Sequence, residues 1–238
     1  MTLKELLAEL RNNILRDVTY RVGASSDEYL WTDETLIRYI NEAERKFCRM
    51  TQCLRDKTTA AVTQVTLQPD VAEYVIDKRV LDVLDVHIQG YQLRPSQNDA
   101  LNGYPGNVAT GSVNVKASRR GRPLLFSLDE ADRTLRLYPI PSEEFAGTIA
   151  YLRVARLPLN PLTKSNLAAS PEVDEDYHLE LLEWAAWRAL RNHDVDAENM
   201  AKASAHKTRF LQAVDEMNID AKRAKASPVQ FGVNARFD

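Results

Sequence analysis

Apolar residues recur at helical spacing near the start of the chain. Leu3, Leu6, Leu7, Leu10 and Ile14 form one stripe, which predicts an amphipathic helix over about the first seventeen residues. Glycine and serine residues at positions 23–26 end this region.

A second helix is predicted from Asp33 to about Met50. Thr32 supplies a cap residue, and two acids in the first turn complement the positive end of the helix dipole. One side of this helix is apolar apart from Glu44, and its members are Leu36, Ile37, Ile40, Ala43, Glu44 and Phe47.

Helical spacing returns in the last third of the chain. After Ser170 and Pro171, a long helix is predicted from about Asp174 to Asn192, opened by a cluster of acids. Another follows over positions 196–226, with a basic end, and Pro228 stops it.

The middle of the chain, residues 58–157, consists of short β-rich runs separated by turn residues. Glycine and proline are concentrated between Gln89 and Pro123, which predicts long loops or a projecting hairpin. The predicted strands are Ala61–Leu67, Leu81–Ile88, Leu124–Leu128, Thr134–Tyr138 and Thr148–Val154.

This order of elements predicts an α+β fold. Because helices near both ends must bury their apolar stripes, we expect them to form one four-helix core, with an antiparallel β domain inserted between them. The expected parts are N-terminal helices at 1–57, an inserted β domain at 58–157, C-terminal helices at 170–226 and an extended tail at 227–238.

Composition excludes several classes of protein. The chain has 44% hydrophobic and 27% charged residues, ordinary for a folded protein, and its net charge of −3 does not indicate a general polyanion binder. Cys48 and Cys53 form no zinc or disulfide motif. No signal peptide and no membrane-spanning run is expected, so a reducing cytoplasm is the expected compartment.

We expect no enzyme, no cofactor and no metal site. The sequence has no phosphate-binding glycine loop, dinucleotide fingerprint, nucleophile elbow or paired-histidine zinc helix. The acidic run 129–132 lacks the glycine and terminal glutamate of a calcium loop, which favours a solvated hairpin turn.

The helix predicted over 174–192 carries the most informative surface. Its apolar arc exceeds half the circumference, and Trp187 lies in the remaining polar stripe with Glu183 and Arg191. Two interpretations stay open for Trp187: packing under the β domain of its own chain, or anchoring a neighbouring subunit.

A basic cluster, Arg119, Arg120 and Arg122, falls in the predicted loop region. Three guanidinium groups at a loop tip suit contact with an acidic protein neighbour or with phosphate, and a solvated loop is the third interpretation.

Several motifs together resemble the head-to-tail adaptor (head-completion) proteins of tailed bacteriophages, including the larger adaptors of short-tailed phages. Trp31–Ala43 is similar to the opening helix of that family, which begins with an acid and ends in Asn-x-Ala. Leu135–Pro141 and Tyr151–Arg153 resemble its paired strands separated by a Pro-x-Pro turn. Pro171–Ala186 resembles its Tyr-His-x-x-Leu helix start, whereas Gly90–Pro123 has no counterpart.

The resemblance implies a non-enzymatic subunit of the virion neck. It implies a homo-oligomeric ring of about twelve copies that sits on the portal, contacts tail or nozzle proteins and lets DNA pass without specific binding. It also implies that the C-terminal tail docks onto the portal, with apolar side chains that binding would order: Val229, Phe231, Val233 and Phe237.

Two other functions remain open. A tail-tube or tail-completion ring protein would share the ring but bind other tail proteins. A helical DNA-binding regulator would use the outward side of the helix from Asp33, where Glu34 and Glu42 dilute a basic set: Arg38, Arg45, Lys46 and Arg49.

Overall fold

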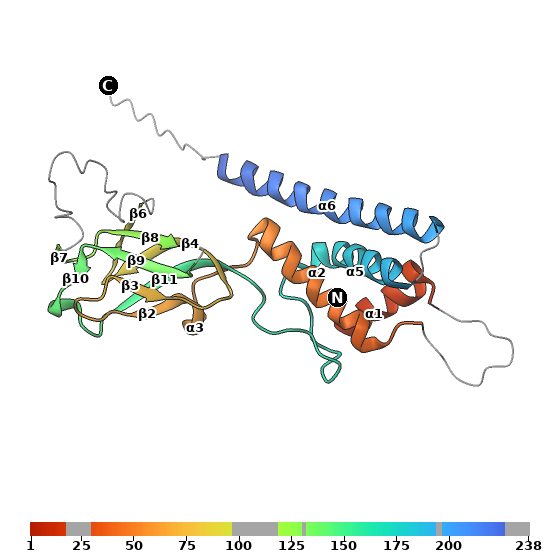
Figure 1. Cartoon of the computed structure of the whole chain (residues 1–238), viewed down its shortest axis with the longest axis horizontal. Coiled ribbons are helices and arrows are strands. Elements are labelled where there is room, and N and C mark those ends of the chain that lie inside the picture. The colour runs from red at the N-terminus through yellow and green to blue at the C-terminus, as the bar shows by residue number, and fades with distance from the viewer. Residues whose placement is uncertain (18–29, 97–118, 130–131, 194–196, 227–238) are drawn as a thin grey trace, which may run out of the picture. The chain divides into compact units, whose positions relative to one another are not determined.

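The chain divides into two compact units. The computed structural model describes all residues except 18–29, 97–118, 130–131, 194–196 and 227–238. We call Met1–Thr51 with Pro161 onward the helical unit, and Gln52–Asn160 the β unit (Figure 1). The α+β class predicted from the sequence is confirmed, with helices in one unit and mostly antiparallel strands in the other.

The first helix is shorter than predicted. α1 (Leu3–Glu9) begins with a capping box in which Thr2 and Glu5 exchange hydrogen bonds between side chain and backbone. Residues 10–15 continue as a π-helix, η1, which ends at a left-handed residue, Arg16. Leu10 and Arg11, both in η1, are buried.

Three long helices form most of the helical unit. They are α2 (Asp33–Thr51), α5 (His178–His193), which follows a short 3-10 turn, η4 (Glu175–Tyr177), and α6 (Ala197–Ala226). α5 packs against both α2 and α6, and α1 with η1 packs on α2 and α5 (Figure 1). Part of the core is one cluster of buried residues: Leu3, Leu6, Leu7, Leu10, Leu36, Ile37, Tyr39, Ile40, Leu162, Leu182, Ala185, Ala186 and Ala189.

Buried polar groups join the two chain segments of the helical unit. The Asn41 side chain both donates to the Leu162 carbonyl, at 2.9 Å, and accepts from its N–H, at 2.8 Å. Glu44, which is 1% exposed, accepts a hydrogen bond from the backbone N–H of Glu172 at 2.6 Å. Glu44, the one polar residue in the predicted apolar stripe, therefore accepts the hydrogen bond of a backbone N–H in the chain segment that follows the β unit in the sequence.

A buried ion pair fixes the start of α2. Arg11 donates to Asp17 at 2.7 Å and to Asp33 at 2.7 Å, and Asp17 also accepts from the Leu30 N–H at 2.8 Å. Arg11 and Asp17 are 6% and 5% exposed. Removing one partner of such a pair leaves a buried charge without compensation, so this contact fixes how η1 and α2 meet.

The β unit contains a first sheet centred on two long antiparallel strands. β4 (Val80–Ile88) pairs with β11 (Ile149–Arg156), and the register shifts twice, between Arg153 and Val154 and between Ala155 and Arg156. The other edge of β11 pairs with β1 (Arg55–Asp56) and β2 (Gln64–Thr66), while β5 (Tyr91–Gln92) extends the sheet beside β4.

A second sheet and a small strand pair complete the β unit. The second sheet has the order β3-β9-β8-β6, in which the first two pairings are antiparallel and the last is parallel. β10 and β7 pair in parallel. The bounds are Glu73–Val75 for β3, Thr134–Tyr138 for β9, Leu125–Asp129 for β8, Arg94–Pro95 for β6, Ile140–Pro141 for β10 and Arg120–Gly121 for β7.

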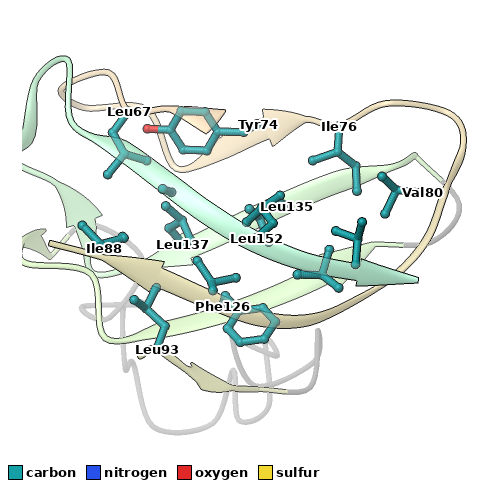
Figure 2. Packing of buried hydrophobic residues seen from close by; sticks show 14 of the residues in the cluster. Leu67, Tyr74, Ile76, Val80, Ile88, Leu93, Phe126, Leu135, Leu137 and Leu152 are labelled. Carbon is teal, nitrogen blue, oxygen red and sulfur yellow. The ribbon is translucent and has the colours of Figure 1, made fainter. Parts of the chain in front are cut away.

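The core of the β unit is made by side chains from both sheets. Leu135 and Leu137 alternate with polar residues along β9, as the period of a half-buried strand requires. Figure 2 shows them meeting Leu152 of β11 and Phe126 of β8 between the strands. The two sheets therefore stabilise each other through one apolar cluster.

Two expectations for the β unit need correction. The run Ala61–Leu67 is not one strand: its first residues form a short helix, α3 (Ala60–Thr63), and β2 follows. The strands on either side of the Pro-x-Pro turn do not pair with each other. β9 pairs with β3 and β8, and the two edges of β11 are occupied by β4 and by β1 with β2, so the strands belong to different sheets.

A buried carboxylate organises the start of the β unit. Asp56 accepts hydrogen bonds from the backbone N–H of Thr58, at 2.8 Å, and of Thr59, at 3.0 Å, and from Arg156 at 2.7 Å. Burial alone raises the pKa of Asp56, but these donors outweigh it and hold the pKa well below its usual range.

We expect Asp56→Asn to lower the free energy of unfolding by roughly 2 kcal/mol near neutral pH. Because the folded-state pKa is depressed, the stabilisation is present above the unfolded pKa of about 4 and is lost as the pH falls toward the folded value. Urea denaturation across this pH range should show that the difference in free energy of unfolding between the wild type and Asp56→Asn decreases as the pH falls.

The matched control is Asp70→Asn, which removes an exposed partner of Arg120 at a left-handed residue where asparagine is tolerated. Its effect should stay below about 0.5 kcal/mol. An equal loss in both variants, or an Asp56→Asn effect that does not change with pH, would contradict this account.

Candidate functional site

A groove runs along the outer side of α2. Its volume is about 470 Å³, and one wall comes from α5. Its lining residues are Arg38, Asn41, Glu42, Arg45, Lys46, Arg49 and Trp184. Arg38, Arg45 and Arg49 recur every seven and four residues, which places them on one side of the helix.

The groove is positively charged. Within the described residues, no carboxylate lies within ion-pair distance of Arg38, Arg45, Lys46 or Arg49. Its single acid, Glu42, is held by α5: it pairs with Arg188 at 3.1 Å and accepts from the indole N–H of Trp184 at 3.3 Å. The arginines are exposed and free to meet an anionic group from outside the unit.

Trp187 lies beside this groove, half-buried between α5 and α6. Its ring centroid is 4.4 Å from that of Trp184. Three cations lie over the Trp187 ring: Arg188 at 5.8 Å, Arg191 at 5.6 Å and Lys207 of α6 at 5.4 Å. Trp187 is therefore a half-buried ring held by cation–π contacts, and tryptophan and arginine are enriched among the residues that dominate binding energy at protein interfaces.

Glu183 is engaged within its own chain. Its carboxylate is 2.6 Å from Nδ1 of His206 and 3.7 Å from Arg209, both on α6. Of the three residues that the sequence places in one surface stripe, Glu183 thus fastens α6 to α5, whereas Arg191 is exposed beside Trp187.

The predicted arginine cluster is partly held by the β unit itself. Arg120 forms an ion pair with Asp70, and the guanidinium of Arg122 lies over the Tyr91 ring. The backbone carbonyl of Arg119 accepts a hydrogen bond from the N–H of Ile140, and the Arg119 side chain is exposed. The structure therefore does not bring the three guanidinium groups together around one ligand.

The predicted portal-binding tail lies outside the described residues, including Val229, Phe231, Val233 and Phe237. Over the part of the chain that is described, no three histidine, cysteine, aspartate or glutamate side chains are grouped as a metal site would require. No described helix is long and apolar enough to cross a membrane.

Sequence reasoning identified the cations of the groove but not the groove itself. Trp184 and Arg188 lie on α5, more than a hundred residues after α2, and no local sequence pattern predicts that they pack against Glu42 of α2. The buried Arg11 did leave a signal, because it lies four residues after Leu7 on the apolar stripe and has two aspartates downstream.

The two adjacent tryptophans should differ in their effect on stability. Trp184 is 7% exposed and packs on Phe210 with ring centroids 5.0 Å apart, so Trp184→Ala should lower the free energy of unfolding by about 3 kcal/mol. Trp187→Ala, at a half-buried site, should cost only about 1 kcal/mol. Thermal melting of both variants tests this, and an equal or larger loss for Trp187→Ala would show that Trp187 belongs to the core.

A family model described as SU10 adaptor protein matches residues 1–232, which covers both units. No curated protein matches the chain.

Proposed function

The chain belongs to the SU10 adaptor protein family, and on that premise we propose that it is a subunit of the ring that joins a capsid portal to a tail. The family is one of bacteriophage adaptors, structural proteins of the virion. The observation that carries the proposal is the match over residues 1–232, because it includes the helical unit and the β unit together.

In the proposed assembly, about twelve copies surround a channel through which DNA passes without base recognition. The net charge of −3 supports passage without strong attachment. Portal protein on one side and tail or nozzle proteins on the other are the proposed partners. The short-tailed type of virion and a position in its neck are part of the same proposal.

The proposed contact between neighbouring copies includes Trp187, Arg191 and Glu183. Trp187 and Arg191 are the residue types that most often dominate binding energy at interfaces, and they lie next to each other on α5. Glu183 supports them indirectly, because it holds His206 and Arg209 of the adjacent helix in place.

A tail-tube or tail-completion ring protein remains the alternative within the same architecture. It would assemble into a ring without binding a portal, so portal binding separates the two functions. A DNA-binding regulator is favoured only by the cations of the α2 groove, which form no ion pair among the described residues, and the net charge of −3 does not indicate a general polyanion binder.

We expect the C-terminal tail to dock onto the portal. Deleting residues 228–238 should abolish co-sedimentation with a purified cognate portal ring, because the apolar side chains of that segment would no longer be available. Melting of the helical unit should not change, since α6 ends at Ala226.

The control is the quadruple variant Val229→Ser, Phe231→Ser, Val233→Ser and Phe237→Ser, which keeps the length and removes only the apolar groups. It should bind as poorly as the deletion. Full portal affinity in both variants would show that the tail is not the docking segment, while full-length protein that fails to bind would contradict the adaptor function itself.

A further inference from the structure

The α2 groove holds a row of arginines that form no ion pair among the described residues, although Arg38 lies over the Tyr39 ring. Arg38, Arg45 and Arg49 span about 16 Å along one side of the helix. Arg49 lies in the last turn of α2, where a cation complements the helix dipole, but Arg45 and Arg49 also repel each other as like charges four residues apart. Arginines that form no ion pair among the described residues are suited to an acidic partner from outside.

The same unit presents an acidic surface at the start of α5. We call Asp174, Asp176, Glu180 and Asp220 the acidic end. Asp174 caps η4, Asp176 lies in η4, Glu180 lies on α5 and Asp220 lies on α6. All four are near Tyr177, whose pKa is raised by its burial and then by their charges. Three of the four are exposed, and Glu180 is half-buried.

The groove and the acidic end face different directions within one chain. Phe47 is fully buried and its ring is 5.3 Å from that of Tyr177, so this side of α2 faces the acidic end. Arg45 and Arg49, each two residues from Phe47, lie about 160° around the helix from it. No ion pair joins the two surfaces in the described chain.

We propose that the α2 groove of one copy receives the acidic end of the next copy. This rests on the proposed ring, because two different and complementary patches on each subunit are what a head-to-tail contact needs in order to close into a ring. The groove is continuous with the contact already proposed, since Trp184 in its wall packs against Trp187.

A second copy fits the groove better than nucleic acid does. Its volume of about 470 Å³ suits a protruding protein segment, whereas a duplex requires a broad surface along which phosphates can lie. Glu42 is fixed inside the groove by Arg188 and Trp184 and acts equally on a carboxylate and a phosphate, so the shape of the groove decides between the two occupants.

The test is a charge exchange between two variants of the full chain. The groove variant carries Arg45→Glu and Arg49→Glu, and the end variant carries Asp176→Lys and Asp220→Lys. Sedimentation velocity at low ionic strength and the highest soluble concentration should show that the wild type self-associates. Each variant alone should associate about tenfold or more weakly. An equimolar mixture should associate again, because each altered surface then meets its complement.

Two further variants keep the test decisive. Lys57→Glu with Lys78→Glu makes the same change of charge on the β unit and should associate like the wild type. If the groove variant melts early, Arg45→Gln with Arg49→Gln replaces it. A wild type that stays monomeric, a variant that associates normally by itself, or a mixture that fails to associate would overturn the proposal.

The outcomes separate this contact from the adaptor function. Variants that self-associate poorly but add to the portal in full number would show that the groove is not the ring contact, although the chain is an adaptor. If the mixture associates again but the wild type does not bind the portal, the proposed contact between copies is supported and the adaptor function is contradicted. Salt-sensitive binding of duplex DNA that the groove variant loses, with no rescue in the mixture, would identify the groove as a nucleic-acid site and overturn the proposal.

Discussion

The helical unit depends on contacts between two chain segments, one that precedes the β unit in the sequence and one that follows it. Asn41 and Leu162 are separated by 121 residues, and Glu44 and Glu172 by 128, yet both pairs are joined by short hydrogen bonds. These bonds fix how the chain re-enters the helical unit before α5, so the packing of α5 on α2 follows from them. An unsatisfied Glu44 would leave a buried charge in this core, which makes the constraint costly to break.

Once α5 is in place, it supplies both the interior and the surface of the unit. Trp184 packs on Phe210 inside, forms one wall of the α2 groove and contacts Trp187 at the edge. Glu42 and Arg188 link α2 to α5 at the same position. A structural protein that acts by assembly needs surfaces that are rigid before binding, and here the proposed contact residues rest on packed helices.

The sequence allowed the long elements to be predicted, because α2 and α5 carry a period of 3.6, β9 alternates with a period of 2, and β4 is rich in β-branched residues. Strands of two or three residues, such as β1, β5 and β7, have no period and exist only because a longer strand lies beside them. The β-branched run at 61–67 favoured a strand, but tertiary contacts made its first half helical. For the candidate site, the cations of α2 were visible in the sequence, whereas the wall formed by Trp184 depends on long-range packing.

The proposed function requires that this chain forms a ring on a portal. Native mass spectrometry of the full chain mixed with a purified cognate portal ring is the decisive measurement, because it counts the copies that bind. We expect stoichiometric addition of about twelve copies, the number proposed for a closed ring on a portal. A portal ring that retains its own mass, with no copy of this chain bound, would contradict it.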